Sequence, residues 1–508
     1  MTHSFNPTIL REYDIRGIVG GTLTEADAYA LGRTFAALAL DESARRIAVG
    51  RDGRTHSGML EAALVRGLTE GGVDAILTGM GPSPMLYFAT HYLDVDGGIQ
   101  VTGSHNPADY NGFKLLLNGR SVFGQEIQEI GRRSAAGDWT TGTGSTEEVD
   151  VREAYVNRLF EGFSGRAFRI GWDAGNGAAG PILDMLVERL PGQHHVIFSE
   201  VDGAFPNHHP DPTVEKNLEH LKRLVAEKQL DFGIAFDGDG DRIGAVDGKG
   251  RVIWGDQLML ILAEAVLKEL PGATIIADVK ASQVLFDGIA ALGGQPLMWK
   301  TGHSLIKSKM KETGAPLAGE MSGHIFFKHR WYGFDDALYA AVRLIEAVSA
   351  SGKSLTEIMD AMPKSVATPE LRFQVDEVRK FAIVQEVRDR LWADGAKVDP
   401  TDGPGQHCRR LVAAPRVEHT RCAGGESRGG GSVRARPARQ PNRRSAGQVR
   451  RRARRYDPLG RQLHSPLNRN RVAAKTTIEM TNVTLAQSKP DKSPRWDSRP
   501  NQVASTAM

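Results

Sequence analysis

The chain has 508 residues, with 64 Lys and Arg against 61 Asp and Glu and only two cysteines. This length predicts several domains, and the sequence contains no run of about 18 apolar residues that would span a membrane. The N-terminal segment lacks the charged and then apolar pattern of a signal peptide, so we expect a cytoplasmic protein that does not bind membranes.

Charge is distributed unevenly along the chain. Residues 404–508 contain 23 Lys and Arg against 6 Asp and Glu, and subtracting these from the totals leaves 41 basic and 55 acidic residues in 1–403. Both cysteines, Cys408 and Cys422, lie in the basic part. The first 403 residues therefore contain no thiol, which excludes disulfides and cysteine catalysis there.

Short apolar segments that end in aspartate recur three times, at intervals of about 100 residues. They span residues 46–52, 168–173 and 273–278. Each precedes a polar loop and a helix-like segment, such as Ser57–Leu68. Strands that alternate with amphipathic helices are typical of α/β layers. The pattern predicts three related α/β domains in tandem, which we place at residues 1–150, 151–250 and 251–365.

The segment Gln100–Pro107 presents one hydroxyl, that of Ser104, between a glycine and a histidine at the end of an apolar run. Gly103 permits positive φ and the close approach of a ligand, and Pro107 prevents the loop from continuing as a helix. A serine in this setting is a candidate nucleophile or carrier of a phosphoryl group. An ordinary turn is the alternative, because Ser, Asn, Gly and Pro are also the commonest turn residues.

A glycine-rich segment, Gly175–Gly180, offers a rival interpretation. It fits the G-x-G-x-x-G pattern of dinucleotide-binding folds, and Glu200 follows at about the distance expected of a ribose ligand. The chain then continues into Gly203–Pro212, which is not the continuation that such a fold requires. A dinucleotide-dependent oxidoreductase is therefore the weaker interpretation.

Three carboxylates occupy alternate positions of one loop, with glycines between them. They are Asp237, Asp239 and Asp241. The flanking segments 232–236 and 243–246 are expected to be strands, and Gly248 stands where a calcium-binding EF-hand needs glutamate. Anions this close are costly unless a cation compensates, and oxygen ligands suit a hard ion such as Mg²⁺ or Ca²⁺. A solvated acidic turn is the alternative.

Four ordered motifs resemble those of the α-D-phosphohexomutases. They are Thr102–Pro107, Phe205–Pro212, Asp237–Arg242 and Gly319–His324. The resemblance extends from Tyr13 to about Gly403. The branch of the family that the chain resembles most is bacterial phosphomannomutase/phosphoglucomutase. The resemblance implies domains arranged around a cleft. It also implies interconversion of hexose 1-phosphate and hexose 6-phosphate, of mannose or glucose, through a phosphoserine and a hexose 1,6-bisphosphate. We expect a monomer whose partners are these sugar phosphates.

The same resemblance assigns roles to individual residues. Ser104 would be the phosphoserine of the first domain, and Mg²⁺ would be bound by Ser104 and the three aspartates of the second. The expected catalytic residues are Ser104, Lys114, His324 and Arg16. The expected substrate-binding residues are Tyr13, Arg242, Lys280, His303, Glu320 and Ser322, the last two reading sugar hydroxyls in the third domain. Lys114 and His324 are candidates for proton transfer, with a surface lysine and a core histidine as the alternatives.

The end of the chain departs from the family. Its members finish with a fourth domain whose loop, spelled about Arg-Ala-Ser-Asn-Thr, binds the non-reacting phosphate of the substrate, and no such string follows Gly403. With degenerate codons and a start one base later, Leu411–Thr420 can be read as Trp-Trp-Leu-Leu-Arg-Ala-Ser-Asn-Thr. We infer a shift of the reading frame near Gly403.

We therefore assign residues 366–403 to the remnant of an incomplete fourth α+β domain and 404–508 to an aberrant basic tail. Its high positive charge and few aromatic residues predict disorder. Arginine-rich tails also bind the phosphate backbones of nucleic acids, but an out-of-frame origin predicts no specific nucleic-acid partner. The alternative function is an impaired or inactive mutase that retains only metal and sugar-phosphate binding.

Overall fold

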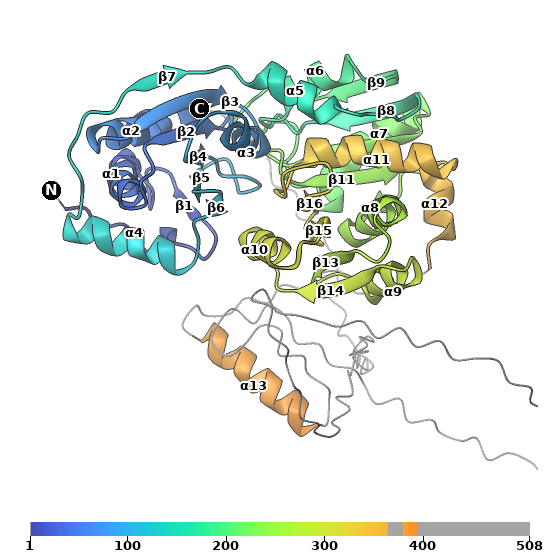
Figure 1. Ribbon diagram of the computed structural model, residues 1–508. Coiled ribbons are helices and arrows are strands. Elements are labelled where there is room, and N and C mark those ends of the chain that lie inside the picture. The colour runs from blue at the N-terminus through green and yellow to red at the C-terminus, as the bar shows by residue number, and fades with distance from the viewer. Residues whose placement is uncertain (1, 364–378, 395–508) are drawn as a thin grey trace, which may run out of the picture. The chain divides into compact units, whose positions relative to one another are not determined.

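The computed structural model describes residues 2–363 and 379–394. These contain three tandem α/β domains, as the sequence predicted (Figure 1). Beyond the third domain the described part adds one helix, α13 (Lys380–Ala393). Our expectations for the basic tail, and for the rest of the fourth-domain remnant, lie outside the described residues. Within the described part, no helix combines the length and the apolar character that a bilayer span requires.

The first domain is built around a 7-stranded mixed sheet. Its strands are β1 (Ile15–Ile18), β2 (Arg46–Arg51), β3 (Asp74–Met80), β4 (Gly97–Val101), β5 (Tyr110–Leu117), β6 (Arg120–Ser121) and β7 (Thr146–Glu148). Its helices are η1 (Pro7–Ile9), α1 (Glu25–Asp41), α2 (Ser57–Glu70), α3 (Ser83–Tyr92) and α4 (Gln125–Ala136). The strand order is β1-β5-β4-β2-β3-β7, with β6 on β5. In α2 the leucines 60, 64 and 68 recur at helical spacing and are all buried, so this helix packs against the core.

The second domain has a 5-stranded sheet of order β12-β11-β10-β8-β9. Its strands are β8 (Phe168–Asp173), β9 (Gly192–Ile197), β10 (Phe232–Phe236), β11 (Ile243–Asp247) and β12 (Val252–Ile253). Its helices are α5 (Arg152–Phe160), α6 (Gly180–Val187), η2 (Glu215–Leu218) and α7 (Glu219–Lys228). β10 and β11 are antiparallel, and the acidic loop is the turn between them. The strands expected on both sides of that loop are confirmed.

The third domain has a 4-stranded sheet of order β14-β13-β15-β16. Its strands are β13 (Thr274–Asp278), β14 (Gln295–Trp299), β15 (Leu317–Gly319) and β16 (Ile325–Phe327). Its helices are α8 (Gly255–Glu269), α9 (Gln283–Ala291), α10 (His303–Thr313), α11 (Ala337–Ser351) and α12 (Leu355–Ala361). β15 and β16 are antiparallel, so the segment from Glu320 to His324 forms the turn that joins them.

The sheet of the first domain packs against a core of its own, whereas a second apolar core joins helix α3 of that domain to the second and third domains. This second core contains Tyr87 and Phe88 of α3, Trp172 of β8 and Phe327 of β16, all buried. Aromatic side chains of this size dominate the energetics of cores because each buries a large apolar surface. The shared core therefore fixes the loops at the strand ends of the three domains relative to one another.

Candidate functional site

Ser104 lies in a tight loop between β4 and β5 and is buried. Its amide donates to Thr102 Oγ1 (2.8 Å), and its Oγ donates to Asp237 Oδ2 of the second domain (3.0 Å). The positive φ of this loop belongs to Ser104 itself (48°), so the expectation that Gly103 supplies it is wrong. The hydroxyl thus faces the acidic loop, which follows it by more than a hundred residues.

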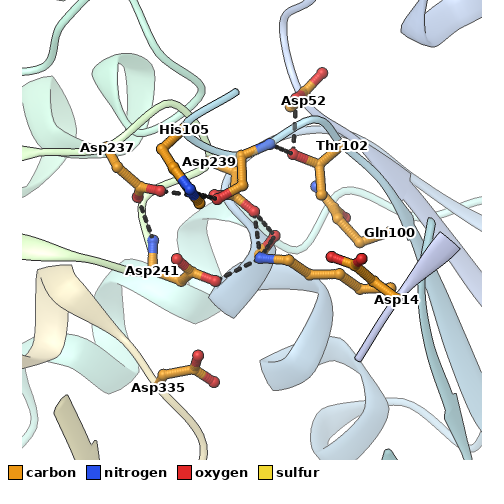
Figure 2. Close-up of polar contacts among 12 residues, drawn as sticks. Asp14, Asp52, Gln100, Thr102, His105, Asp237, Asp239, Asp241 and Asp335 are labelled. Atoms are coloured by element: carbon orange, nitrogen blue, oxygen red, sulfur yellow. Dashed lines mark hydrogen bonds and ion pairs between the residues drawn. The ribbon is translucent and has the colours of Figure 1, made fainter. Parts of the chain in front are cut away.

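The acidic loop turns tightly and directs its three carboxylates to one place (Figure 2). Asp237, Asp239 and Asp241 are all fully buried, which excludes a solvated turn. Gly240 adopts a φ of 71°, which favours glycine. A Cβ on Gly238 would lie 2.6 Å from the carbonyl oxygen of Ser104, so the acidic loop packs directly on the serine loop.

Lys114 is the basic residue closest to these carboxylates. Its Nζ donates to Asp239 Oδ2 (2.6 Å) and forms a second, shorter contact with Asp241. Strand β5, which carries it, lies between β1 and β4, and the side chain is buried. The alternative of a surface lysine on an edge strand is therefore wrong.

The negative charge of the acidic loop exceeds what Lys114 can neutralise. Burial raises the pKa of Asp237, and the charges of Asp239 and Asp241 raise it further. The Oδ1 atoms of Asp239 and Asp241 are buried and find no hydrogen-bond partner among the described residues. Buried polar atoms normally have partners, and carboxylate oxygens are what hard divalent cations prefer. The donor set and its unbalanced charge thus fit a divalent metal ion.

His324, in the turn between β15 and β16, is contacted at both ring nitrogens. Arg242 Nε donates to His324 Nε2 (2.9 Å), while Nδ1 lies 2.9 Å from Asp335 Oδ2 and 3.5 Å from Asp241 Oδ1. An arginine can only donate, so Nε2 accepts and the proton of a neutral ring is assigned to Nδ1, beside Asp335. Asp241, His324 and Asp335 could also group around a metal, and Asp241 Oδ1, His324 Nδ1 and Asp335 Oδ2 each lack a hydrogen-bond partner among the described residues.

Glu320 and Ser322 share the turn with His324. Ser322 Oγ donates to Glu320 Oε2 (2.9 Å), and Glu320 Oε1 accepts from the amide of Gly302 (2.8 Å). Asp278, at the end of β13, accepts from the amide of Met321 (3.1 Å). Burial and the charge of Glu320 raise the pKa of Asp278 to about 7. The turn is thereby tied to two neighbouring strand ends.

The remaining expected residues belong to the first and third domains, with Tyr13 and Lys280 on loops, Arg16 on β1 and His303 at the start of α10. Tyr13 donates its hydroxyl to the carbonyl of Thr301 (3.0 Å), and the ring of His303 lies 5.9 Å from that of His324. Arg16 Nη1 donates to Asn106 Oδ1 (2.7 Å) in the serine loop. Lys280 follows β13 and is half-buried.

The glycine-rich segment that suggested dinucleotide binding supports the acidic loop. The amide of Ala178 donates to the carbonyl of Gly238 (3.0 Å), and a Cβ on Gly177 would lie 2.8 Å from the same oxygen. Asn176 Nδ2 donates to the carbonyl of Glu200 (2.9 Å), the residue considered as a ribose ligand. Glycines here allow close packing of backbone on backbone.

Several residues of the site were missed from the sequence. Asp335, Asp52 and Asp278 each hold a loop or side chain of the site, and Arg54 lies beneath Ser104. Asp52 and Asp278 end two of the repeated apolar segments, a signal that was noted only as evidence of fold. Asp335 and Arg54 carry no local pattern that distinguishes them.

Comparison with known proteins agrees with the three-domain architecture. Models of phosphoglucomutase/phosphomannomutase match in order: alpha/beta/alpha domain I at residues 7–141, domain II at 153–250 and domain III at 254–366. A phosphomannomutase/phosphoglucomutase of Pseudomonas aeruginosa is 44% identical over 407 residues, covering 78% of this chain and 88% of that protein. A phosphoglucomutase of Neisseria gonorrhoeae is 42% identical over 415 residues, covering 79% and 90%.

Among solved structures, a phosphoglucomutase/phosphomannomutase family protein from Burkholderia thailandensis superposes with a TM-score of 0.72 at 42% identity. The match covers 78% of this chain and 86% of that one. A structure described as a putative phosphomannomutase from Thermus thermophilus shares the fold, with a TM-score of 0.64 at 24% identity.

Proposed function

Because the chain belongs to the phosphoglucomutase/phosphomannomutase family of hexose phosphate mutases, we propose that Ser104 carries the phosphoryl group in its reaction. The observation that supports this most is the 3.0 Å contact between Ser104 Oγ and Asp237 Oδ2, which joins the serine loop to a buried carboxylate cluster. The enzyme is an isomerase, and mannose and glucose phosphates are the substrates that we propose from its relatives.

We propose Mg²⁺ as the metal, held by Ser104 and the three carboxylates of the acidic loop. These four side chains offer oxygen ligands only, the set that a hard cation prefers. When bound, the ion would offset the negative charge of the transferring phosphoryl group. Lys114 and Arg242 add positive charge next to the same carboxylates.

The reaction that we propose has two phosphoryl transfers. In the first, the bond between Ser104 Oγ and phosphorus breaks while the free hydroxyl of hexose 1-phosphate bonds to phosphorus and loses its proton. The resulting hexose 1,6-bisphosphate turns around, and the other phosphoryl group returns to Ser104, leaving hexose 6-phosphate. The enzyme is proposed to work as a cytoplasmic monomer.

Proton transfer is assigned to Lys114 and His324. Burial lowers the pKa of Lys114, but Asp239 and Asp241 raise it by more, so the side chain holds its proton as an ammonium group and is not the acceptor. His324 is the proposed acceptor, because its Nε2 carries the lone pair to which Arg242 now donates. A shift of Arg242 toward a substrate phosphate would free that lone pair.

Sugar and phosphate recognition is assigned to the loops that surround this centre. Glu320 and Ser322 are proposed to contact sugar hydroxyls, because their oxygens lie side by side in the turn after β15. The other proposed substrate-binding residues are Tyr13, Arg16, Arg242, Lys280 and His303. On this proposal, residues 1–150 carry the phosphoserine, 151–250 bind the metal and 251–365 recognise the sugar.

The assignment of Ser104 is tested by Ser104→Ala. After incubation with glucose 1,6-bisphosphate, intact-mass measurement should find one phosphate on the parent chain and none on the variant. Interconversion of mannose 1- and 6-phosphates should be abolished in a frame-corrected chain with this substitution. Ser134→Ala, which removes another buried hydroxyl far from the acidic loop, is the control. Full activity of Ser104→Ala would overturn the assignment.

A further inference from the structure

Arg54 lies beneath the loop that carries Ser104 and binds its backbone from inside. Nη2 donates to the carbonyl oxygens of Ser104 (2.5 Å) and Asn106 (2.6 Å), and Nη1 donates to those of Pro107 (2.6 Å) and Tyr110 (3.1 Å). The side chain is completely buried. Three carbonyls of the loop and that of Tyr110, the first residue of β5, thus converge on a single guanidinium group.

Only an arginine can serve four carbonyls in this way. Buried carbonyls need hydrogen-bond partners, and Arg54 supplies one to each of these four, of which that of Pro107 also accepts from the amide of Tyr110 (3.0 Å). A guanidinium group offers five N–H donors in a planar fork, whereas the ammonium group of lysine offers three from one point. Replacement of Arg54 by lysine would therefore leave part of the loop without partners.

The two residues before Ser104 are adapted to the same contact. A Cβ at position 103 would lie 2.5 Å from Arg54 Nε and 2.6 Å from Arg54 Cζ. Because Gly103 has no side chain, the guanidinium group of Arg54 can approach the loop closely. Asp52, 3.3 Å from Arg54 Nε, accepts from Thr102 Oγ1 (2.7 Å) and from the amide of Gly103 (3.1 Å). Asp52 and Arg54 together hold both sides of the loop.

Residues of the second domain pack against Arg54. The ring of Phe205 lies 5.0 Å from Arg54 Cζ, and a Cβ on Gly203 would lie 2.6 Å from Arg54 Cα. An aromatic face over a guanidinium is attractive and shields it from water. The grip of Arg54 on the serine loop is thus completed only when the first and second domains pack together.

We propose that Arg54 is a positioning residue that presents Ser104 for phosphoryl transfer. A positive φ is strained for serine and persists only where the surroundings impose it. Arg54 and Asp52 impose it here, and the resulting conformation directs Ser104 Oγ toward Asp237. The inference rests on the proposed function, since it assigns to Arg54 the orientation of the serine that carries phosphate.

The test compares Arg54→Lys with the control Arg51→Lys in the full chain. Arg51 ends the preceding strand and pairs with Glu61 at a partly exposed position. The rate at which Ser104 takes phosphate from glucose 1,6-bisphosphate is followed by intact mass over a range of sugar concentrations. Arg54→Lys should lower the maximal rate about 10²-fold, the cost of a misplaced reacting group, and leave the half-saturating concentration unchanged. Arg51→Lys should match the parent.

A second measurement separates positioning from general destabilisation. Hydrogen exchange of the amides in 102–110 should accelerate in Arg54→Lys, while the strands of the second domain exchange at the parent rate. Methylguanidinium should restore part of the rate to Arg54→Ala. Parent-like rate and exchange in Arg54→Lys would overturn the inference.

Two other outcomes are equally decisive. If Ser104 of the parent chain takes up no phosphate, the proposed function is contradicted. The hydrogen exchange of residues 102–110 would still test whether Arg54 holds the serine loop in place. If Arg54→Lys does not fold, the same two measurements are made on Phe205→Leu. Phe205 is half-buried, so this substitution exposes the guanidinium group of Arg54 without removing it. Unchanged exchange in 102–110 and an unchanged rate in that variant would overturn the inference.

Discussion

Single side chains around Ser104 show how the site balances its charge. Three buried carboxylates face Lys114 and Arg242, and two carboxylate oxygens lack partners among the described residues. Such clusters are stable when a cation enters or when a proton is retained. The raised pKa of Asp237, which burial and the neighbouring carboxylates cause, expresses the same imbalance.

Asp239→Asn should weaken metal binding, because affinity for a hard cation depends on the charge of its ligands. We expect the Mg²⁺ concentration for half-maximal phosphoryl transfer to rise by about tenfold or more, with partial recovery of the rate at high Mg²⁺. A Mg²⁺ titration of the rate measures this. Asp231→Asn, at the far end of β10, is the control. An unchanged metal dependence would show that Asp239 is not a ligand.

His208 should make stability depend on pH. Its Nε2 lies 3.0 Å from Asp173 Oδ2; burial lowers the pKa of the imidazole, but Asp173 raises it more, so it lies above the ordinary 6.5. The folded state therefore holds the proton more tightly than the unfolded state. The stabilisation is complete below the unfolded pKa and is lost as pH rises through the raised pKa.

The variant His208→Gln should thus lose more unfolding free energy at about pH 6 than at about pH 8.5. Urea unfolding at the two pH values measures the difference. His195→Gln, on β9 of the same domain, controls for the loss of a histidine outside the pair. Equal losses at both pH values would mean that the pair contributes no pH-dependent stability.

At the scale of elements, one hydrogen-bonding arrangement recurs in all three domains. Strands β2, β8 and β13 are each followed or ended by an aspartate that binds a loop amide. Asp52 accepts from Gly103, Asp173 accepts from Gly175 (2.9 Å), and Asp278 accepts from Met321. The first of these loops carries Ser104 and the third carries Glu320 and Ser322, while the second supports the acidic loop. The repeated sequence segment thus corresponds to a repeated way of fixing a loop.

Helix α11 begins beside the acidic loop, which predicts a link between helix capping and metal binding. Asp336 accepts from the amide of Tyr339 (2.9 Å) and the hydroxyl of Tyr155 (2.8 Å), and the amide of Ala337 donates to the carbonyl of Gly240 (3.3 Å). Asp336→Ala should lower stability by about 1–2 kcal/mol through the lost cap and should also weaken Mg²⁺ binding.

Thermal unfolding and a Mg²⁺ titration measure the two effects. Ser354→Ala is the matched control, because Ser354 caps α12 in the same way through Glu357 at an exposed position. It should lower stability and leave metal affinity unchanged. If Asp336→Ala loses stability without losing metal affinity, the helix does not position the acidic loop.

At the scale of the whole molecule, the site exists only because three domains meet. The serine loop comes from the first domain, the acidic loop from the second, and the turn with Glu320 and His324 from the third. The antiparallel bridge between Arg242 and His324 joins the last two directly. Packing of the shared core is therefore a condition for activity as well as for stability.

The reading-frame shift that we infer near Gly403 predicts a catalytic defect in the chain as given. On that inference it lacks the string that the family resemblance assigns to the distal phosphate, and binding energy from remote groups helps to reach the transition state. Correcting the frame by one base near Gly403 should raise kcat/KM for mannose 1-phosphate by about tenfold or more, through a lower KM and a higher kcat. Steady-state kinetics of both chains measure this. Equal kinetics would contradict the frameshift.

The sequence by itself determined the family and the three tandem α/β domains. Local patterns can be recognised from the sequence alone. They include the strands that end in aspartate, the strands around the acidic loop and the four motifs. Tertiary structure decided the positive φ of Ser104, the burial of Lys114 and the hydrogen bonds of Arg54 to the serine loop. Ser104 and Asp237 are separated by 133 residues, and Lys114 and Asp241 by 127. Such contacts depend on strand order and on a shared core, neither of which leaves a periodic trace in the sequence.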